Sequence, residues 1–155
     1  MFCDLCIFYT RAPAHTRADL CYSAPSVRRG TRTRAGSMRV GGPLSTALCA
    51  RDDNTVTVYT RYRQMDMLDA IPSGAVIIVE PGNESSAAHW GELMTNTALQ
   101  RGAKGIVING GLRDSLPILD VGFPAFRKYY SPLTAAYRWN IDSLDLPIKV
   151  GNVTI

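Results

Sequence analysis

The strongest constraint on the fold is a pair of short apolar runs separated by one segment of helix length. Residues 75–79 (Ala-Val-Ile-Ile-Val) and 105–109 (Gly-Ile-Val-Ile-Asn) are rich in β-branched side chains, which is typical of strands buried on both faces. The segment 91–101 between them carries one helical stripe and is followed by Gly102, a common helix stop. This order predicts an α/β layered domain with helical crossover connections. The stripe consists of Leu93, Met94, Ala98 and Leu99.

Weaker patterns predict further elements on both sides of this unit. Gly110-Gly111 predicts a turn directly after the second apolar run, and Gly122 is expected to end a short helix. The remaining expected elements, in chain order, are a strand at 45–49, a loop at 83–90, one or two helical turns at 114–120, and strands at 123–126, 148–150 and 153–155.

The segment 55–69 fits two structures. Residues 55–59 (Thr-Val-Thr-Val-Tyr) alternate with period two, which favours a strand. Val58, Tyr62 and Met65 recur at helical spacing, and Asn54 is a suitable residue to cap a helix. The residues alone leave both structures open.

The positive charge of the chain lies in its first 37 residues. The formal net charge is +4; residues 1–37 hold six arginines and two aspartates, whereas residues 38–155 hold eleven basic and eleven acidic residues. We expect residues 1–37 to be an Arg-rich leader that is flexible or poorly packed, with an organellar transit peptide or a phosphate-binding arm as alternatives. Residues 38–155 are expected to form the folded domain. Because that domain is neutral, the charge gives little support for nucleic-acid binding.

Neither the cysteines nor the hydropathy pattern points to a metal-stabilised or membrane protein. Cys3-x-x-Cys6 is half of a zinc knuckle, but the second half is missing, so we expect reduced thiols in an intracellular, cytoplasmic protein. No apolar run approaches the roughly 18–20 residues of a membrane-spanning helix.

The residues best suited to chemistry follow the two expected strands, where parallel α/β folds bind ligands. Arg113 offers a planar fork for a carboxylate, and Asp114 offers a hard oxygen to Mg²⁺. Together they could hold a 2-oxo acid by both ends. The alternative is structural: Asp114 caps the short helix and Arg113 is a solvated charge.

A second group lies at the start of the expected helix. Gly91 leaves the first backbone N–H groups of the helix free to bind an anion, and Glu92 could act as an acid–base group or lie near a metal. The alternative for Glu92 is a first-turn acid that complements the helix dipole. We interpret His89 as a packed or solvated ring rather than a base, and Trp90 as part of the core or the wall of the site.

Three stretches together resemble a known family. They are Trp90-Gly-Glu-Leu, Arg101-Gly-Ala-Lys-Gly-Ile-Val-Ile-Asn-Gly-Gly-Leu-Arg-Asp114 and Gly122-Phe-Pro-Ala-Phe126. They are similar to the regulator of ribonuclease activity A family, which includes class II pyruvate aldolases acting on 4-hydroxy-4-methyl-2-oxoglutarate. The resemblance covers residues 38–155 and is strongest from 74 to 126. It implies a layered α-β-β-α sandwich with a swivelling-domain-like core, and it favours a helix for 55–69, because Asp52-Asp53-Asn54 resembles the family's helix start.

The resemblance also implies a set of roles. Asp114 would be the ligand of a divalent cation (Mg²⁺ or Mn²⁺), and Arg113 would clamp the pyruvate carboxylate. The amides of Gly91, Glu92, Leu93 and Met94 would bind further anionic groups, with Glu92 as a second catalytic residue. The implied reaction is metal-assisted retro-aldol cleavage of a small 2-oxo acid, with oxaloacetate decarboxylation as a side activity. Family members form trimeric rings, sometimes stacked into hexamers, with the site between subunits.

The sequence departs from the aldolase pattern at three places. Glu92 stands where aspartate is more usual, Pro117 stands where a further acid is expected, and the family's last strand pair is missing after Ile155. We therefore expect C-terminal strands that are truncated. Two alternatives remain: a non-catalytic protein that regulates a ribonuclease by binding it, and a truncated gene product with little activity.

Overall fold

The computed structural model describes residues 5–12, 15–22, 38–51, 58–135, 138–150 and 153–154. Up to residue 62 the description is of the backbone, apart from the buried side chains of Thr46 and Ala47.

A mainly parallel sheet forms the centre of the fold. Strand β4 (Val76–Glu80) pairs in parallel with β3 (Met38–Arg51) and with β6 (Gly105–Leu112). Strand β6 also pairs in parallel with β5 (Ala88–Trp90) and with β7 (Ala125–Tyr130). The expected strands at 75–79 and 105–109 are therefore confirmed as the middle of one sheet.

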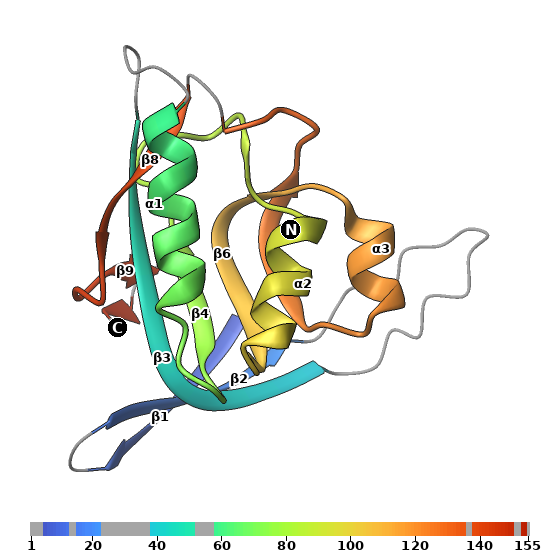
Figure 1. Cartoon of the computed structure of the whole chain (residues 1–155). Helices are drawn as coiled ribbons and strands as arrows, with labels where there is room; N and C mark the ends of the chain where they lie inside the picture. The colour runs from blue at the N-terminus through green and yellow to red at the C-terminus, as the bar shows by residue number, and fades with distance from the viewer. Residues whose placement is uncertain are drawn as a thin grey trace.

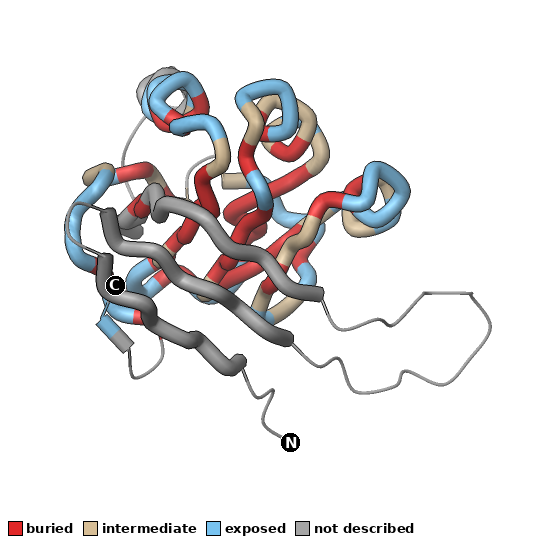
Figure 2. Tube along the Cα trace, turned by 90° about the horizontal axis from the view of Figure 1, so that it is seen from below, coloured by how far each residue is buried: buried red, intermediate tan, exposed pale blue. Residues whose placement is uncertain are grey.

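The helices cover one face of this sheet. In Figure 1, α1 (Val58–Asp69), α2 (Glu92–Gln100) and α3 (Ser115–Asp120) lie side by side in front of the strands. The view from below in Figure 2 shows the buried residues between these helices and the strands. The expected α/β layered class is confirmed, and so is the helical alternative for 58–69; residues 52–57 lie outside the described residues.

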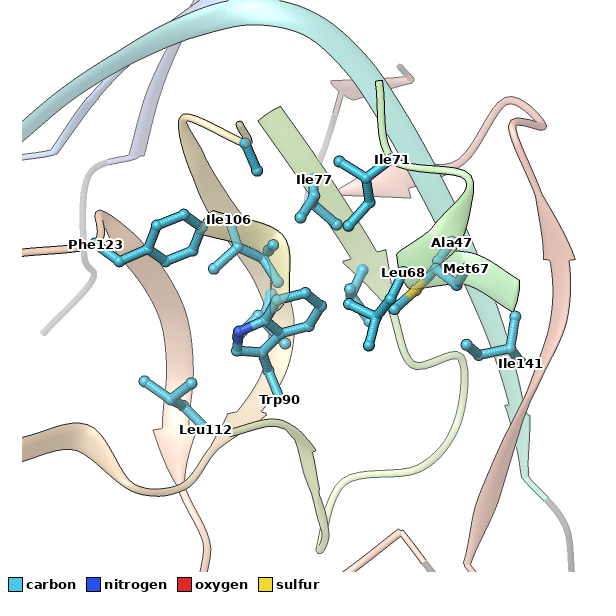
Figure 3. Close-up of a cluster of buried hydrophobic side chains, with 14 of the residues drawn as sticks. Ala47, Met67, Leu68, Ile71, Ile77, Trp90, Ile106, Leu112, Phe123 and Ile141 are labelled. Atoms are coloured by element: carbon cyan, nitrogen blue, oxygen red, sulfur yellow. The ribbon is translucent and has the colours of Figure 1, made fainter. Parts of the chain in front are cut away.

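The core consists of apolar side chains from the sheet and the inner faces of the helices. Ile77 and Ile106 come from neighbouring strands, and Trp90 and Phe123 fill the space beside them (Figure 3). All four side chains are almost fully buried. Burying a side chain of this size stabilises the fold by roughly 1.5–3 kcal/mol, so these four residues contribute strongly to holding this part of the fold together.

The N-terminal segment contains strands where a leader was expected. Strand β1 (Leu5–Ala12) pairs antiparallel with β2 (His15–Tyr22), and β2 pairs antiparallel with the first part of β3. Figure 1 shows that β3 is long and bends, so that its first part lies beside β2 and its second part lies beside β4. The pairing between β2 and β3 joins segments that are not adjacent in the sequence, and no local sequence pattern predicts it. The arginines between residues 28 and 34 lie outside the described residues.

The C-terminal segment adds a strand that the sequence analysis missed. Strand β8 (Trp139–Leu144) pairs antiparallel with the end of β3, and Trp139 and Ile141 are buried. Alternation of these two apolar residues with polar neighbours was the available signal. The expected strands near 148–150 and 153–155 appear as β9 (Lys149–Val150) and β10 (Val153–Thr154), which pair with each other.

One predicted turn is wrong. Gly110 and Gly111 do not turn the chain but lie within β6, which continues to Leu112. A Cβ atom on Gly111 would lie 2.6 Å from Cε2 of Tyr129 and closer still to the carbonyl oxygen of Ala87. Glycine is therefore needed at these positions because the chain around β5 lies too close to β6 for a side chain, and not because the chain turns there. The same approach makes 88–90 a short strand where only a loop was expected.

The two predicted helix stops are confirmed. Gly102 and Gly122 have φ angles of +83° and +68°, which L side chains rarely adopt. None of the helices in the described part of the chain is long and apolar enough to cross a membrane.

Candidate functional site

The candidate site lies where β5 and β6 end and the chain enters α2 and α3. The amide of Arg113 donates a hydrogen bond to the carbonyl oxygen of Trp90 at 3.0 Å. This bond places the Gly91-Glu92 segment next to Arg113-Asp114. The two groups of residues that the sequence predicted as one site, 21 positions or more apart, are thus brought together by the parallel pairing of β5 with β6.

Gly91 allows the two segments to touch. A Cβ atom at this position would lie 2.7 Å from Oδ2 of Asp114 and 2.8 Å from Nε of Arg113. Any side chain would push the charged pair away. The structure therefore requires glycine here for close approach, in agreement with the prediction of a bare helix start.

Asp114 joins Arg113 to the start of α2. Its Oδ2 accepts a hydrogen bond from the amide of Glu92 at 3.1 Å and lies 3.3 Å from Nε of Arg113. The side chains of Asp114 and Arg113 are 39% and 41% exposed, so the pair stays accessible to a small molecule. A carboxylate at a helix start is also favoured by the helix dipole.

The backbone of Asp114 is strained. Its φ and ψ angles are +54° and +41°, the left-handed region, which costs a residue with a Cβ about 1–2 kcal/mol. Asp114 occupies the cap position of α3, but its side chain makes no capping hydrogen bond to that helix. The structural alternative, in which Asp114 caps the short helix, is therefore confirmed for the position of the residue but not for its side chain, whose carboxylate contacts the start of α2 and Arg113.

The first turn of α2 differs in detail from the prediction. The amide of Glu92 is already bonded to Asp114, so in the described part of the chain the amides of Leu93 and Met94 are the first-turn donors of α2 that remain. Leu93 is 77% exposed, whereas Met94 packs against the core. Glu92 is partly exposed at the first turn of the helix.

The donor set restricts which cation the site could hold. Among the described residues, no cluster of three or more histidine, cysteine, aspartate or glutamate side chains forms a metal site. Within the same part of the chain, both contacts of the Asp114 carboxylate use Oδ2, which leaves Oδ1 for a cation. A single carboxylate fits Mg²⁺ or Mn²⁺, which favour oxygen ligands, and Mg²⁺ usually keeps several waters. It does not fit a tetrahedral zinc site.

A buried pair behind the site was not predicted. Glu84 and His89 are 7% and 1% exposed. Oε2 of Glu84 lies 3.2 Å from Nε2 of His89, but the angle between the two groups does not allow a hydrogen bond. Nδ1 of His89 accepts a hydrogen bond from the amide of Gly111 at 3.2 Å. The carboxylate of Glu84 accepts hydrogen bonds from the amides of Ser86 and Ala87 and from the Ser86 hydroxyl. The interpretation of His89 as a packed ring is confirmed. No sequence pattern identified Glu84 as its neighbour.

The surroundings set the charge of both groups. Burial lowers the pKa of His89 from 6.5 to about 4, although the charge of Glu84 opposes this shift. Burial by itself would raise the pKa of Glu84, but the hydrogen bonds from Ser86 and Ala87 outweigh it and lower the pKa below 4.5. Near neutral pH, His89 is therefore uncharged, and because Nδ1 accepts from Gly111, the proton is on Nε2.

This pair predicts that acid destabilises the fold. Unfolded His89 takes up its proton near pH 6.5 and folded His89 only near pH 4, so below pH 6.5 the unfolded chain binds more protons. The free energy of unfolding is expected to fall by about 2 kcal/mol between pH 7.5 and pH 5. Urea denaturation at the two pH values measures this change. The His89→Asn variant cannot titrate there and should lose about 2 kcal/mol less; an equal loss in both proteins would contradict the assignment.

The chain is similar to several known proteins. The profile of the RraA-like family, described as Aldolase/RraA, matches residues 17–155. A protein of Pseudomonas syringae pv. tomato, provisionally named a 4-hydroxy-4-methyl-2-oxoglutarate aldolase, is 29% identical over 142 residues, which cover 88% of this chain and 81% of that protein. The protein DlpA of Legionella pneumophila is 25% identical over 118 residues, 76% of this chain but only 19% of DlpA.

A solved structure shares the fold. Streptomyces coelicolor RraAS2, described as an unusual member of the RNase ES inhibitor RraA protein family, superimposes with a TM-score of 0.60 at 19% identity. The match covers 74% of this chain and 56% of RraAS2. At this identity the likeness concerns the fold alone. The profile match begins within β2, so the matched region includes part of the segment that the sequence analysis assigned to a leader.

Proposed function

This chain belongs to the RraA-like family, and from that premise we propose that it is a divalent-metal-dependent aldolase that cleaves 4-hydroxy-4-methyl-2-oxoglutarate-type substrates and releases pyruvate. The observation that carries the proposal is the Arg113–Asp114 pair, held against Gly91 at the carboxyl ends of β5 and β6. In this pair, a guanidinium that is suited to bind a carboxylate lies next to a carboxylate oxygen that is suited to bind a metal ion. The aldolase name of the P. syringae relative supports the same class of reaction.

Arg113 would hold the carboxylate of the substrate. Its Nε is engaged by Asp114, which orients the guanidinium and leaves the terminal nitrogens for a bidentate pair with a carboxylate. The amides of Leu93 and Met94 are a second set of donors at the positive end of α2. These groups would fix the 2-oxo acid at its carboxylate end.

Asp114 would hold Mg²⁺ or Mn²⁺ through Oδ1. When bound, such a cation supplies Lewis-acid stabilisation of the negative charge that develops on the 2-oxo group as the C–C bond breaks. Glu92, in the first turn of α2, is the candidate general base that takes the proton of the substrate hydroxyl. The same charge stabilisation would allow decarboxylation of oxaloacetate.

One residue departs from the pattern of the aldolases. Pro117 lies in the first turn of α3 at the position where the family resemblance places a further acid.

The resemblance also implies a homotrimer, or a hexamer of stacked trimers, with the site between subunits. We propose the same assembly for this chain.

Removal of the metal tests the reaction. Pyruvate release from oxaloacetate, followed with a coupled lactate dehydrogenase assay, is expected to stop with EDTA and to return when Mg²⁺ or Mn²⁺ is added in excess. The cleavage of 4-hydroxy-4-methyl-2-oxoglutarate should show the same dependence. If neither substrate is turned over above the rate with metal alone, the aldolase proposal is wrong, and a ribonuclease-binding regulator becomes the function to test.

A further inference from the structure

The pairing of β5 with β6 is irregular at one position. Ala88 is opposite Gly111 and Trp90 is opposite Leu112, and the register shifts between these two pairs, at His89. A shift of this kind disturbs the regular ladder of backbone hydrogen bonds. Here the amide of Gly111 donates a hydrogen bond to Nδ1 of His89 at 3.2 Å. A side chain thus supplies an acceptor where the ladder is irregular.

The imidazole itself is held from several sides. Glu84 lies 3.2 Å from Nε2, and its carboxylate is bound in turn by the amides of Ser86 and Ala87. The ring of Trp139 lies at a centroid distance of 4.9 Å, and its Nε1 donates to the carbonyl oxygen of Ala88. A Cβ atom on Gly110 would lie 2.7 Å from Nδ1, so the strand is also in close contact with the ring. His89 therefore has little freedom to move relative to β6.

The candidate site begins directly after this point on both strands. Two residues beyond His89, Gly91 contacts the side chains of Arg113 and Asp114; two residues beyond Gly111, the amide of Arg113 bonds to Trp90. The contact at Gly91 tolerates no added atom, so it depends on the separation of β5 from β6. The His89–Gly111 hydrogen bond links the two strands two residues before this contact and so helps to set their separation.

We infer that His89, which is packed against Glu84 and bonded to the Gly111 amide, is a positioning residue for the clamp formed by Gly91, Arg113 and Asp114. This inference rests on the proposed aldolase function for its kinetic consequence, but its structural consequence stands apart from it. His89 touches no substrate. It acts as a neutral acceptor, and loss of that acceptor should let the ends of β5 and β6 separate, which loosens the bond between the Glu92 amide and Asp114.

The test compares two replacements of His89. His89→Phe keeps a ring but has no acceptor, whereas His89→Asn has an oxygen that can replace Nδ1. Amide hydrogen exchange of Gly111 and Glu92, followed by NMR, is expected to be about tenfold faster in the Phe variant, which corresponds to the loss of one hydrogen bond of about 1.4 kcal/mol. The KM for oxaloacetate should rise by about the same factor with a smaller change in kcat. His89→Asn should restore most of both effects.

A matched control separates positioning from general loosening. Tyr129→Phe removes a hydrogen bond to the carbonyl oxygen of Ala87 but keeps the aromatic ring beside Gly111 and leaves the bond from the Gly111 amide to His89 in place. It should leave the Glu92 amide and the KM nearly unchanged. If His89→Phe does not fold, His89→Ala removes the acceptor without adding volume.

Three results would overturn the inference. They are unchanged exchange at Glu92 in the variants without an acceptor, equal effects of Tyr129→Phe, and no rescue by asparagine. If the wild-type protein turns over no substrate, the proposed function fails, but exchange at Glu92 still decides whether His89 positions the clamp.

Discussion

Replacing Asp114 by asparagine is expected to reduce metal-dependent pyruvate release at least 100-fold while the protein stays folded. Asparagine tolerates the left-handed backbone at φ +54° and keeps an oxygen that can accept the hydrogen bond from the Glu92 amide. It lacks the negative charge that holds a divalent cation. Removal of one group that stabilises developing charge typically costs a factor of about 100–1000 in kcat.

Two further variants make this measurement specific. Asp114→Ala should lose the same activity but also about 1–2 kcal/mol of stability, because it removes the bond to the Glu92 amide and puts alanine in a strained conformation. Asp120→Ala removes an exposed carboxylate at the end of α3 and should keep the wild-type rate. Undiminished turnover in Asp114→Asn, measured by the coupled assay at saturating Mg²⁺, would exclude Asp114 as the metal ligand.

Replacing Gly111 by alanine is expected to lower the free energy of unfolding by about 3 kcal/mol or more. The added methyl group would overlap the carbonyl oxygen of Ala87 and approach Tyr129 Cε2 to 2.6 Å. The carbonyl belongs to backbone that the hydrogen bonds to Glu84 hold in place, so it cannot move away cheaply. Overpacking of this kind usually costs 1–3 kcal/mol and, against rigid backbone, about 3 or more.

Gly122→Ala is the matched control for this prediction. Gly122 has a φ angle of +68°, but a Cβ atom there would meet nothing within 4 Å. The free energy of unfolding of Gly122→Ala should fall only by the roughly 1 kcal/mol that backbone strain costs. Urea denaturation of both variants gives the comparison. A smaller loss in Gly111→Ala than in Gly122→Ala would show that the segment at residue 87 does not approach β6 as closely as described.

The parts of the fold that could be predicted are those that local sequence encodes. The apolar runs at 75–79 and 105–109 and the stripe of the helix at 91–101 match β4, β6 and α2 within one to three residues. Burial on both faces demands continuous apolar sequence, and a helix on one face demands a stripe, so both leave a local pattern. For 58–69 the residues were ambiguous, and the family resemblance, not the periodicity, selected the helix.

The candidate site could be predicted in part. Arg113 and Asp114 stood out by chemistry and by their place after a strand, and their contact with Gly91 and Glu92 agrees with that prediction. Their roles in binding metal and substrate stay predictions. Glu84 was not recognised, because a buried carboxylate that binds the backbone of its own loop has no spacing that distinguishes it from a surface charge.

By itself, the sequence determined the α/β class and the helix stops at Gly102 and Gly122, because each of these depends on neighbours within a few positions along the chain. Only the tertiary structure decided that Gly110 and Gly111 continue a strand, that β2 pairs with the first part of β3, and that His89 bonds to Gly111. The physical reason is the same in all three cases. A glycine that turns the chain and a glycine that admits a neighbouring strand look identical in sequence, and contacts between distant segments are specified only once the sheet has formed.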